Sequence, residues 1–303
     1  MNSFKGLFLG LLDLMRLPEW SKSLGNMLIA AVMAAFFGNL IPDFGLVVYG
    51  FLAVGFLWSG LYTLNDWTDH SHDALHPVKK SRAIPSGKVP ANVALVFSIF
   101  LIALSFAIGF TINFFFLLCL LAMLLNQFLY TLKPFNFKKR PVLDLISGSL
   151  INPIFRFYAG WVLFIPAFNA PLLVLIFILG FQFGGYTIYR IASRSHDEKL
   201  DYKSSVVVFG EKKVRTMAYF GMLLGALAFF GMLLTNFFSS FQFLGILPLR
   251  YFWLAVLSLA MLPLYWHALK NPQEMDLKKM YNLVYVHYSL FILGFVLLYF
   301  FNF

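Results

Sequence analysis

The sequence contains few charged residues and a single cysteine. Asp, Glu, Lys and Arg make up 12% of the 303 residues and hydrophobic residues 60%, against roughly 25% and 45–50% in a soluble domain. A soluble fold of this length could not bury so much apolar surface, so part of the chain must face lipid. Cys119 lies within an apolar run, which excludes an intramolecular disulfide and indicates packing rather than chemistry.

The basic residues outnumber the acidic ones, giving a net charge of +10. In a soluble protein this excess would suggest nucleic-acid binding, but here it lies in short loops between apolar runs, so we expect no nucleic-acid partner. The first residues do not resemble a signal peptide, because Asp13 and Arg16 interrupt the apolar positions. Apolar residues at helical spacing instead predict an interfacial amphipathic helix within residues 1–22.

Long apolar stretches dominate the rest of the chain. A membrane-spanning helix needs roughly 17–25 mainly apolar residues. Nine stretches meet this requirement, at residues 23–40, 44–63, 92–111, 113–132, 143–163, 170–189, 215–236, 251–269 and 282–301. We therefore expect an all-α membrane protein, a bundle of nine transmembrane helices that forms one domain over residues 1–303.

The distribution of Lys and Arg tests this count. With nine spans, alternate loops face the same side, and one side receives residues 1–22, 64–91, 133–142, 190–214 and 270–281. The 23 Lys and Arg residues all fall in or directly beside these segments, except Arg156 and Arg250. Because cytoplasmic loops concentrate Lys and Arg, we expect a multi-pass protein of the cytoplasmic membrane with its N-terminus in the cytoplasm and its C-terminus outside.

A cluster of carboxylates follows the second expected span. Asn65, Asp69 and Asp73 share one face if that helix continues past residue 63, and Asp66 lies beside them. Clustered carboxylates repel one another unless a cation lies between them, and Mg²⁺ is typically held by one or two carboxylates together with substrate phosphates. Basic residues that could hold an anion follow in the same loop: Lys79, Lys80 and Arg82. The alternative is a hydrated loop with ordinary surface charge.

A second polar cluster lies at the end of the sixth expected span, on the same side of the membrane. Gln182, Tyr186 and Arg190 form one series at four-residue spacing. A neighbouring series consists of Tyr189, Ser193, Asp197 and Asp201, and on a helix residues 193, 197 and 201 would stack along one face. Two facing clusters could hold two metal ions and clamp a diphosphate between them. A water-soluble diphosphate would not require nine spans, whereas a lipid diphosphate would.

These motifs together resemble a known family. The pattern Asn-Asp-x-x-Asp-x-x-x-Asp at residues 65–73, followed by Arg-x-Ile-Pro-Ser-Gly at residues 82–87, is similar to the first signature of the UbiA-type intramembrane prenyltransferase superfamily. Ala83 stands where the family commonly has Pro. The second signature, Asp-x-x-x-Asp, is matched by Asp197 and Asp201. The helix count and the interval between the motifs also fit, so the resemblance extends over essentially the whole chain.

The second motif has two possible registers. Read directly, Asp197 and Asp201 are its two aspartates. Aligned instead on the Lys-Ser-Ser…Phe-Gly stretch that begins at Lys203, Asp197 takes the second position and Ser193 the first. Both registers retain Asp197, so the second metal site is expected to depend on Asp197 and could be incomplete.

The resemblance implies a helix bundle around a lipid-accessible central cavity, with polar active-site loops on the cytoplasmic side. It implies a Mg²⁺-dependent prenyltransferase that moves a prenyl group from a polyprenyl diphosphate to an aromatic or other lipophilic acceptor. The metal ligands it implies are Asn65, Asp66, Asp69, Asp73, Asp197 and Asp201. The catalytic residues it implies are Asp66, Asp69 and Asp197.

Other residues are predicted to bind substrate: Lys22, Asn26, Lys79, Arg82, Lys139, Arg156, Tyr189, Arg190 and Lys203. Lys22 resembles a basic position that opens the family's first helix, although a snorkelling lysine would give the same pattern. Lys139 belongs to a basic run that also serves topology. Arg156 lies inside a span, where insertion costs ~2.5–3.5 kcal/mol, and such residues are functional candidates by default. Arg156 could equally join helices or reach the membrane surface.

Two alternatives remain at this stage. His76, Pro77 and Lys79, together with Trp20 and Lys22, also resemble the branch of the superfamily that transfers phosphoribose from phosphoribosyl diphosphate to a polyprenyl phosphate. The degenerate second motif favours that branch, whereas Asp197 and the stretch from Lys203 to Gly210 favour prenyl transfer. A transporter or lipid-binding membrane protein would require ionisable residues at mid-membrane on several helices.

Overall fold

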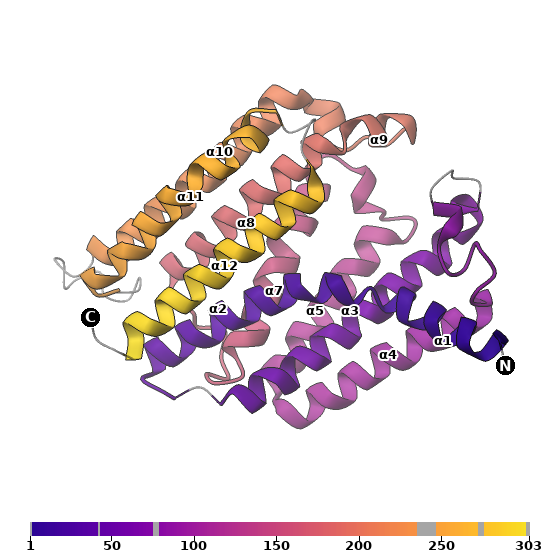
Figure 1. The fold of residues 1–303 in the computed structure, drawn as a ribbon, viewed down its shortest axis with the longest axis horizontal. Coiled ribbons are helices and arrows are strands. Elements are labelled where there is room, and N and C mark those ends of the chain that lie inside the picture. The colour runs from indigo at the N-terminus through magenta and orange to yellow at the C-terminus, as the bar shows by residue number, and fades with distance from the viewer. Residues whose placement is uncertain (1, 42, 75–78, 235–246, 272–275, 301–303) are drawn as a thin grey trace.

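In the computed structural model, every regular element of the described chain is helical. The structure describes residues 2–41, 43–74, 79–234, 247–271 and 276–300. The long helices run side by side along one direction of the molecule (Figure 1). They are α1 (Asn2–Met15), α2 (Ser21–Gly38), α3 (Phe44–Asp73), α4 (Ala91–Ile112), α5 (Phe114–Thr131), α8 (Leu172–Ala192), α10 (Ser205–Leu234), α11 (Phe252–Lys270) and α12 (Leu277–Phe300).

Short elements connect or complete these helices. They are η1 (Leu17–Trp20), η2 (Lys79–Ser81), η3 (Phe137–Lys139), α6 (Leu143–Ile146), η4 (Ser147–Ile151), α7 (Asn152–Trp161), α9 (Arg194–Lys199) and η7 (Leu249–Tyr251). By length and composition, eight helical segments of the described chain could cross a membrane. The fifth expected span, residues 143–163, is not among these eight and is formed by the consecutive elements α6, η4 and α7. The expected helical membrane bundle is therefore confirmed.

This fifth span departs from regular α-helix over a short segment rich in small and polar residues. The segment Ser147–Ile151 is a π-helix, in which the Asn152 N–H donates to the Ser147 carbonyl, five residues earlier. Asn126 of α5 stabilises this segment by donating to the Ser147 carbonyl at 3.1 Å and to the Asn152 side chain at 2.7 Å. Pro153 follows at the start of α7 and has no N–H to lose.

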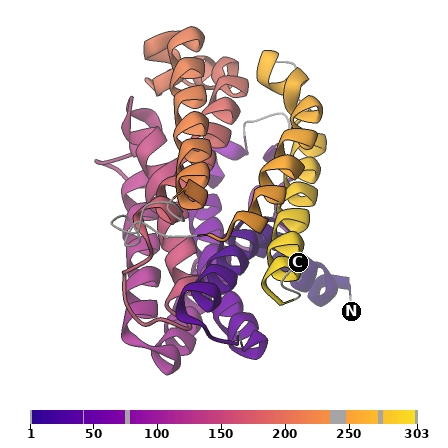
Figure 2. The same ribbon diagram turned by 90° about the vertical axis from the view of Figure 1, so that its left-hand side faces the viewer.

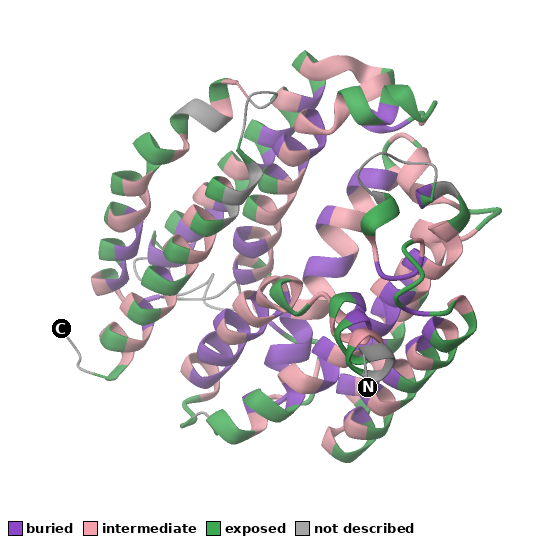
Figure 3. Ribbon diagram, turned by 45° about the vertical axis from the view of Figure 1, so that its right-hand side comes forward, coloured by how far each residue is buried: buried purple, intermediate pink, exposed green. Residues whose placement is uncertain are grey.

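Helices pack closely where glycine removes a side chain. A Cβ atom at Gly160 of α7 would lie 2.3 Å from the Met27 carbonyl oxygen of α2, and one at Gly180 of α8 would lie 2.8 Å from the Cα of Gly225 in α10. Small residues at helix contacts are typical of membrane proteins, where close packing replaces the hydrophobic effect. The helices pack side by side (Figure 2), and buried residues lie on several of them (Figure 3) and form one large apolar core cluster.

The outward faces are apolar as well. Val96, Trp253 and Leu259 expose 67%, 66% and 62% of their surface, which in water would be unfavourable but in lipid is not. The N-terminal helix α1, the end of α3 and the short helix α9 lie at one end of the molecule, and α12 ends at the other (Figure 1). All the predicted polar motifs therefore meet at one end of the bundle.

Candidate active site at one end of the bundle

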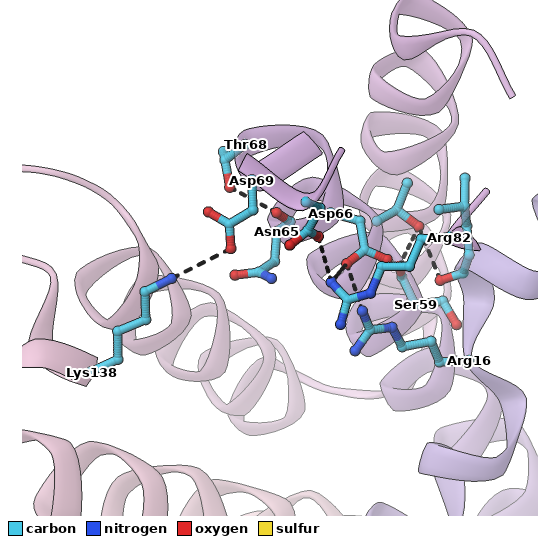
Figure 4. Close-up of polar contacts among 11 residues, drawn as sticks. Arg16, Ser59, Asn65, Asp66, Thr68, Asp69, Arg82 and Lys138 are labelled. Atoms are coloured by element: carbon cyan, nitrogen blue, oxygen red, sulfur yellow. Dashed lines mark hydrogen bonds and ion pairs between the residues drawn. The ribbon is translucent and has the colours of Figure 1, made fainter. Parts of the chain in front are cut away.

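The first motif lies on the last three turns of α3, which continues without a break to Asp73. The prediction that this helix extends past residue 63 is confirmed. Asn65 and Asp69, one turn apart, point to the same side, toward Lys138 of η3 (Figure 4). The Lys138 ammonium lies 3.6 Å from the Asp69 carboxylate, whose side chain is 35% exposed. Asp69 is thus an accessible carboxylate opposite a cation.

Asp66 and Asp73 share one face of α3, because residues seven apart are rotated by only about 20° around a helix. This face differs from the one that carries Asn65. Arg82 donates to both carboxylates, at 3.0 Å to Asp66 and 2.7 Å to Asp73. Arg16 donates to Asp66 at 2.5 Å. Both aspartates are 4% exposed. Their charge is therefore neutralised by arginines, and Asp66 points away from Asp69 and Lys138 (Figure 4).

Arg16 was not among the residues predicted from the sequence. It follows α1 with a left-handed backbone, φ 49°, so the chain turns sharply and η1 begins. Ser59 of α3 donates to the Met15 carbonyl at 2.7 Å, which fixes this turn against the helix. A cavity of about 240 Å³ lies beside the Arg16–Asp66 pair. No motif could have identified Arg16, because its partner is 50 residues away in the chain.

The basic run before the fifth expected span contributes two different lysines. Lys138 faces Asp69, as described above. Lys139, the member of this run that we predicted to bind substrate, instead places its ammonium over the Tyr202 ring, 4.4 Å from the centroid. A cation over an aromatic face is attracted to the ring. The residue that meets the first motif is therefore Lys138.

The second motif does not form the continuous helical face that its spacing predicts. Helix α8 ends at Ala192, and α9 is a separate short helix that ends at Lys199. Asp197 lies within α9 and is 3% exposed, whereas Asp201 lies beyond it, exposed and with a left-handed φ of 52°. The expectation that residues 193, 197 and 201 stack on one helix is wrong, because the helix breaks at Ser193 and again before Asp201.

Asp197 is held by protein groups. Arg190 pairs with its carboxylate, and Ser204 donates to the same oxygen at 2.7 Å. The Tyr202 N–H donates to the Asp197 carbonyl at 2.9 Å. Burial and the neighbouring Asp69 and Asp197 carboxylates raise the pKa of the Tyr202 phenol, so its ring stays neutral between the two motifs.

Asp144 completes this network and was also missed. It is fully buried at the start of the fifth expected span. Its carboxylate accepts from the Ser205 N–H at 3.0 Å and from the Ser205 hydroxyl. Arg190 Nε lies 3.6 Å from the same carboxylate. Arg190 thus joins Asp144 and Asp197. The sequence did contain a signal that could have identified Asp144, because an acidic residue at the start of an apolar stretch is unusual.

Polar groups continue from this end into the interior along the face of α8 that the sequence predicted. Tyr186 shares a hydrogen bond of 3.2 Å with Tyr130 of α5. Gln182 donates to Asn26 of α2 at 3.0 Å and to Tyr288 of α12 at 2.5 Å. Asn26, predicted to bind substrate, therefore lies among polar groups from three helices.

The other predicted substrate ligands differ in their surroundings. Lys22 pairs with Glu19 one helical turn earlier. Tyr189 packs its ring against Tyr186, with centroids 6.1 Å apart. Lys203 is exposed in the loop before α10. The side chain of Lys79 lies outside the described residues.

Arg156 lies on α7 inside the bundle. Its guanidinium carbon is 4.0 Å from the centroid of a Trp58 ring on α3. The Tyr62 hydroxyl, one turn further along α3, is its strongest electrostatic partner. The predicted interior location is therefore what the structure has, and the side chain turns toward α3.

The donor set of the first motif fits Mg²⁺. Asn65 and Asp69 supply an amide oxygen and a carboxylate on one accessible face, whereas the Asp73 carboxylate, one turn beyond Asp69, is held by Arg82. In the part of the chain that the structure describes, no three His, Cys, Asp or Glu side chains converge closely enough to bind a metal by themselves. Mg²⁺ does not require three protein carboxylates, because water and substrate phosphates usually complete its coordination shell. The second motif fits less well, since one Asp197 carboxylate oxygen is already held by Arg190 and Ser204 and Asp201 lies beyond α9 on the surface.

Comparison with known proteins identifies relatives over most of the chain. The profile of the UbiA prenyltransferase family matches residues 26–290. A digeranylgeranylglyceryl phosphate synthase from Methanosarcina mazei is 37% identical over 139 residues, 45% of either chain. A 4-hydroxybenzoate octaprenyltransferase from Yersinia enterocolitica is 25% identical over 211 residues, 65% of this chain and 68% of that protein. The chain spans less than half the length of two of the curated relatives that it matches.

Solved structures share the fold. A UbiA homolog from Archaeoglobus fulgidus bound to DMAPP and Mg²⁺ superposes with a TM-score of 0.73 at 19% identity, covering 94% of this chain and 97% of that one. The same homolog bound to GPP and Mg²⁺ gives a TM-score of 0.71 at 19% identity, covering 95% and 98%. At this identity the agreement concerns the arrangement of helices.

Proposed function

This chain belongs to the UbiA prenyltransferase family, whose members are enzymes that transfer prenyl groups, and we propose that it moves a prenyl group from a polyprenyl diphosphate to a lipophilic acceptor inside the membrane. The observation that carries the proposal is the α3 face on which Asn65 and Asp69 point toward Lys138. Carboxylate and amide oxygens opposite an ammonium suit a metal-bound diphosphate.

The first motif divides its work between two faces of α3. We assign Asn65 and Asp69 to one Mg²⁺, and Asp66 and Asp73 to holding Arg16 and Arg82 in place. Bound Mg²⁺ would act as a Lewis acid that stabilises the charge of the departing diphosphate. Lys138 and Arg82 would add fixed positive charge at the same end of the bundle.

The residues then support a simple bond exchange. The bond between C1 of the prenyl chain and the diphosphate oxygen breaks, and both electrons leave with the diphosphate. The acceptor supplies an electron pair to C1 and loses a proton, so one C1 bond is exchanged for another. The buried apolar core of the bundle excludes water, which protects the allylic cation from hydrolysis.

The Asp197 network has a structural part in this proposal. This network joins the start of the fifth expected span, α8 and the loop before α10 through Asp144, Arg190, Asp197 and Ser204. This joins the segments that carry Lys138 and Tyr202. We therefore propose one metal site, at the first motif, instead of the two that the sequence suggested.

Phosphoribosyl transfer to a polyprenyl phosphate remains the second candidate. The observation that favours it is that Asp197 is occupied by Arg190 and Ser204, which leaves a single carboxylate face for a diphosphate. The membrane-transporter alternative loses its basis, since the chain belongs to a family of transferases.

One assay distinguishes the two transfer reactions. Purified protein with Mg²⁺ is incubated with radiolabelled geranylgeranyl diphosphate or with radiolabelled phosphoribosyl diphosphate, each in turn with aromatic acids, glycerol-phosphate lipids and polyprenyl phosphates. We expect label from the prenyl donor to enter an acceptor product. Label entering lipid from phosphoribosyl diphosphate alone would replace the proposal by the second candidate.

The orientation of the chain is part of the proposal. The concentration of Lys and Arg in the loops at the α3 end supports a cytoplasmic location for the N-terminus and for both motifs.

A further inference from the structure

Arg156 differs from the other arginines near the site in having no carboxylate partner. Arg16 and Arg82 pair with Asp66, and Arg190 pairs with Asp197. Within the described residues, no ion pair joins Arg156 to any acidic side chain, and its Nε is buried without a hydrogen-bond partner. A buried cation is unfavourable unless an anion or hydrogen bonds compensate it. The Tyr62 hydroxyl accepts a hydrogen bond from Arg156, so the protein compensates the charge of Arg156 only in part.

The groups around Arg156 are neutral and able to form hydrogen bonds. Its electrostatic neighbours include the Tyr62 hydroxyl of α3 and the Tyr285 hydroxyl of α12. The carboxylate of Glu19 also interacts electrostatically with Arg156, but Glu19 is paired with Lys22. Tyr288, one turn from Tyr285 on the same helix, accepts from Gln182. One cation therefore lies among phenols and amides from several helices.

The position of Arg156 along the bundle separates it from the metal face. Its contacts Tyr62 and Trp58 lie 7 and 11 residues before Asp69 on α3, which places them about 10 and 16 Å deeper along the helix axis. A diphosphate held at Asp69 would point its prenyl C1 toward this interior. Arg156 thus lies beyond the reacting carbon, where the acceptor must approach.

We infer that Arg156 binds the anionic group of the acceptor, so that the acceptor is a carboxylate or a phosphate and not a neutral molecule. This inference rests on the proposed prenyl transfer. The guanidinium is planar and always charged, and its N–H groups match two oxygens of a carboxylate or phosphate. The Trp58 ring holds the guanidinium from one face, which leaves its edge for the ligand. Tyr62 and Tyr285 supply further donors.

The test compares acceptors that differ only in charge. The carboxylate pair is 4-hydroxybenzoate and its methyl ester, and the phosphate pair is a long-chain glycerol ether phosphate and its free alcohol. Wild-type protein should use one of the two anions and use its neutral partner at least about 10-fold less well, the effect of a lost charge-assisted hydrogen bond. The preferred pair identifies which anion the site takes.

Two variants connect this preference to Arg156. In Arg156→Gln, the KM of the anionic acceptor should rise by about 10-fold or more, while the KM of the prenyl diphosphate stays within about two-fold. The variant should no longer distinguish the anion from its neutral partner. Arg156→Lys, which keeps the charge without the planar fork, should recover part of the affinity. Arg250→Gln is the matched control, because Arg250 also lies beside an aromatic ring, 5.6 Å from the centroid of Tyr251.

Equilibrium binding separates failure of this inference from failure of the proposed function. Binding of each probe without the prenyl donor is followed by intrinsic fluorescence. If no prenyl transfer occurs but the anionic probe still binds wild-type protein and not Arg156→Gln, the anion site stands and the reaction is wrong. The inference would be overturned if Arg156→Gln and Arg156→Lys lost binding of the neutral and the anionic probes equally. A raised KM for prenyl diphosphate in these variants would also overturn it.

Discussion

Arg16 and Asp66 form an ion pair of 2.5 Å although they are 50 residues apart in the sequence. The pair joins the turn after α1 to the motif-bearing end of α3, and Arg82 reaches the same carboxylate from the following loop. Three segments thus depend on one aspartate. This makes Asp66 a structural centre of the site, distinct from the accessible Asp69.

Removing either side of this pair should destabilise the protein. For Arg16→Gln and Asp66→Asn we expect a loss of about 1–3 kcal/mol in the free energy of unfolding, because a mostly buried charged group loses a hydrogen-bond partner. Denaturant titration in detergent micelles measures it. Lys88→Gln is the control, since its partner Asp13 lies 3.6 Å away and both side chains are more than half exposed. Equal stabilities for all three variants would contradict the structural role of Asp66.

The two aspartate motifs should respond differently to metal. Asp69→Asn should weaken Mn²⁺ binding in the presence of pyrophosphate, followed by electron paramagnetic resonance, and should lower kcat by about 100-fold or more. Asp197→Asn should keep Mn²⁺ affinity within about three-fold, because Asp197 is occupied by Arg190 and Ser204. Chelation should abolish wild-type activity, and Mg²⁺ should restore it. Two Mn²⁺ ions bound to wild-type protein and one to Asp197→Asn would instead show that Asp197 is a ligand.

The sequence predicts the first motif well because its information is local. Residues 64–73 contain no Gly or Pro, so α3 could continue, and four-residue spacing then placed Asn65 and Asp69 together. Arg16 and Asp144 could not be predicted in this way, since their partners lie 50 and 61 residues away. The choice between Lys138 and Lys139 depends on the short helix Phe137–Lys139, which turns neighbouring side chains in different directions. The break at Ser193 likewise depends on tertiary contacts of Asp197.

The two lysines of that short helix should differ in function. Lys138→Gln should raise the KM of the diphosphate substrate by about 10-fold, because it removes the cation that faces Asp69. Lys139→Gln should change it by less than about three-fold, as it removes a cation over the Tyr202 ring. Steady-state kinetics with saturating Mg²⁺ measures both. Identical effects in the two variants would mean that the whole basic run acts through net charge.

The orientation of the chain can be tested with reporters. Nine spans place the ends of the chain on opposite sides of the membrane, and in the structure α12 ends at the opposite end of the bundle from α1 (Figure 1). A periplasmic-type reporter fused after residue 303 should therefore be active, and one inserted after residue 202 should be inactive. A cytoplasmic signal at the C-terminus would refute the nine-span topology and the assigned side of both motifs.

Asp144 offers the sharpest test of the buried network. Its carboxylate has no exposed surface and is held by Ser205 and Arg190. Asp144→Asn should lower the free energy of unfolding by about 3–5 kcal/mol, since it leaves part of the Arg190 charge uncompensated in the interior. Ser205→Ala, which removes a hydroxyl and no charge, should lower it by about 1 kcal/mol.

A double-mutant cycle then isolates the pair. If Asp144 acts through Arg190, Asp144→Asn combined with Arg190→Gln should be less destabilising than the sum of the single variants, because the Asp144–Arg190 interaction is then lost only once. Both single variants should also raise the KM of the diphosphate substrate, since the network joins the segments that carry Lys138 and Tyr202. Additive stabilities would show that Asp144 holds Ser205 alone. In that case Arg190 would owe its position to Asp197, and only Asp197→Asn should reproduce the kinetic effect of Arg190→Gln.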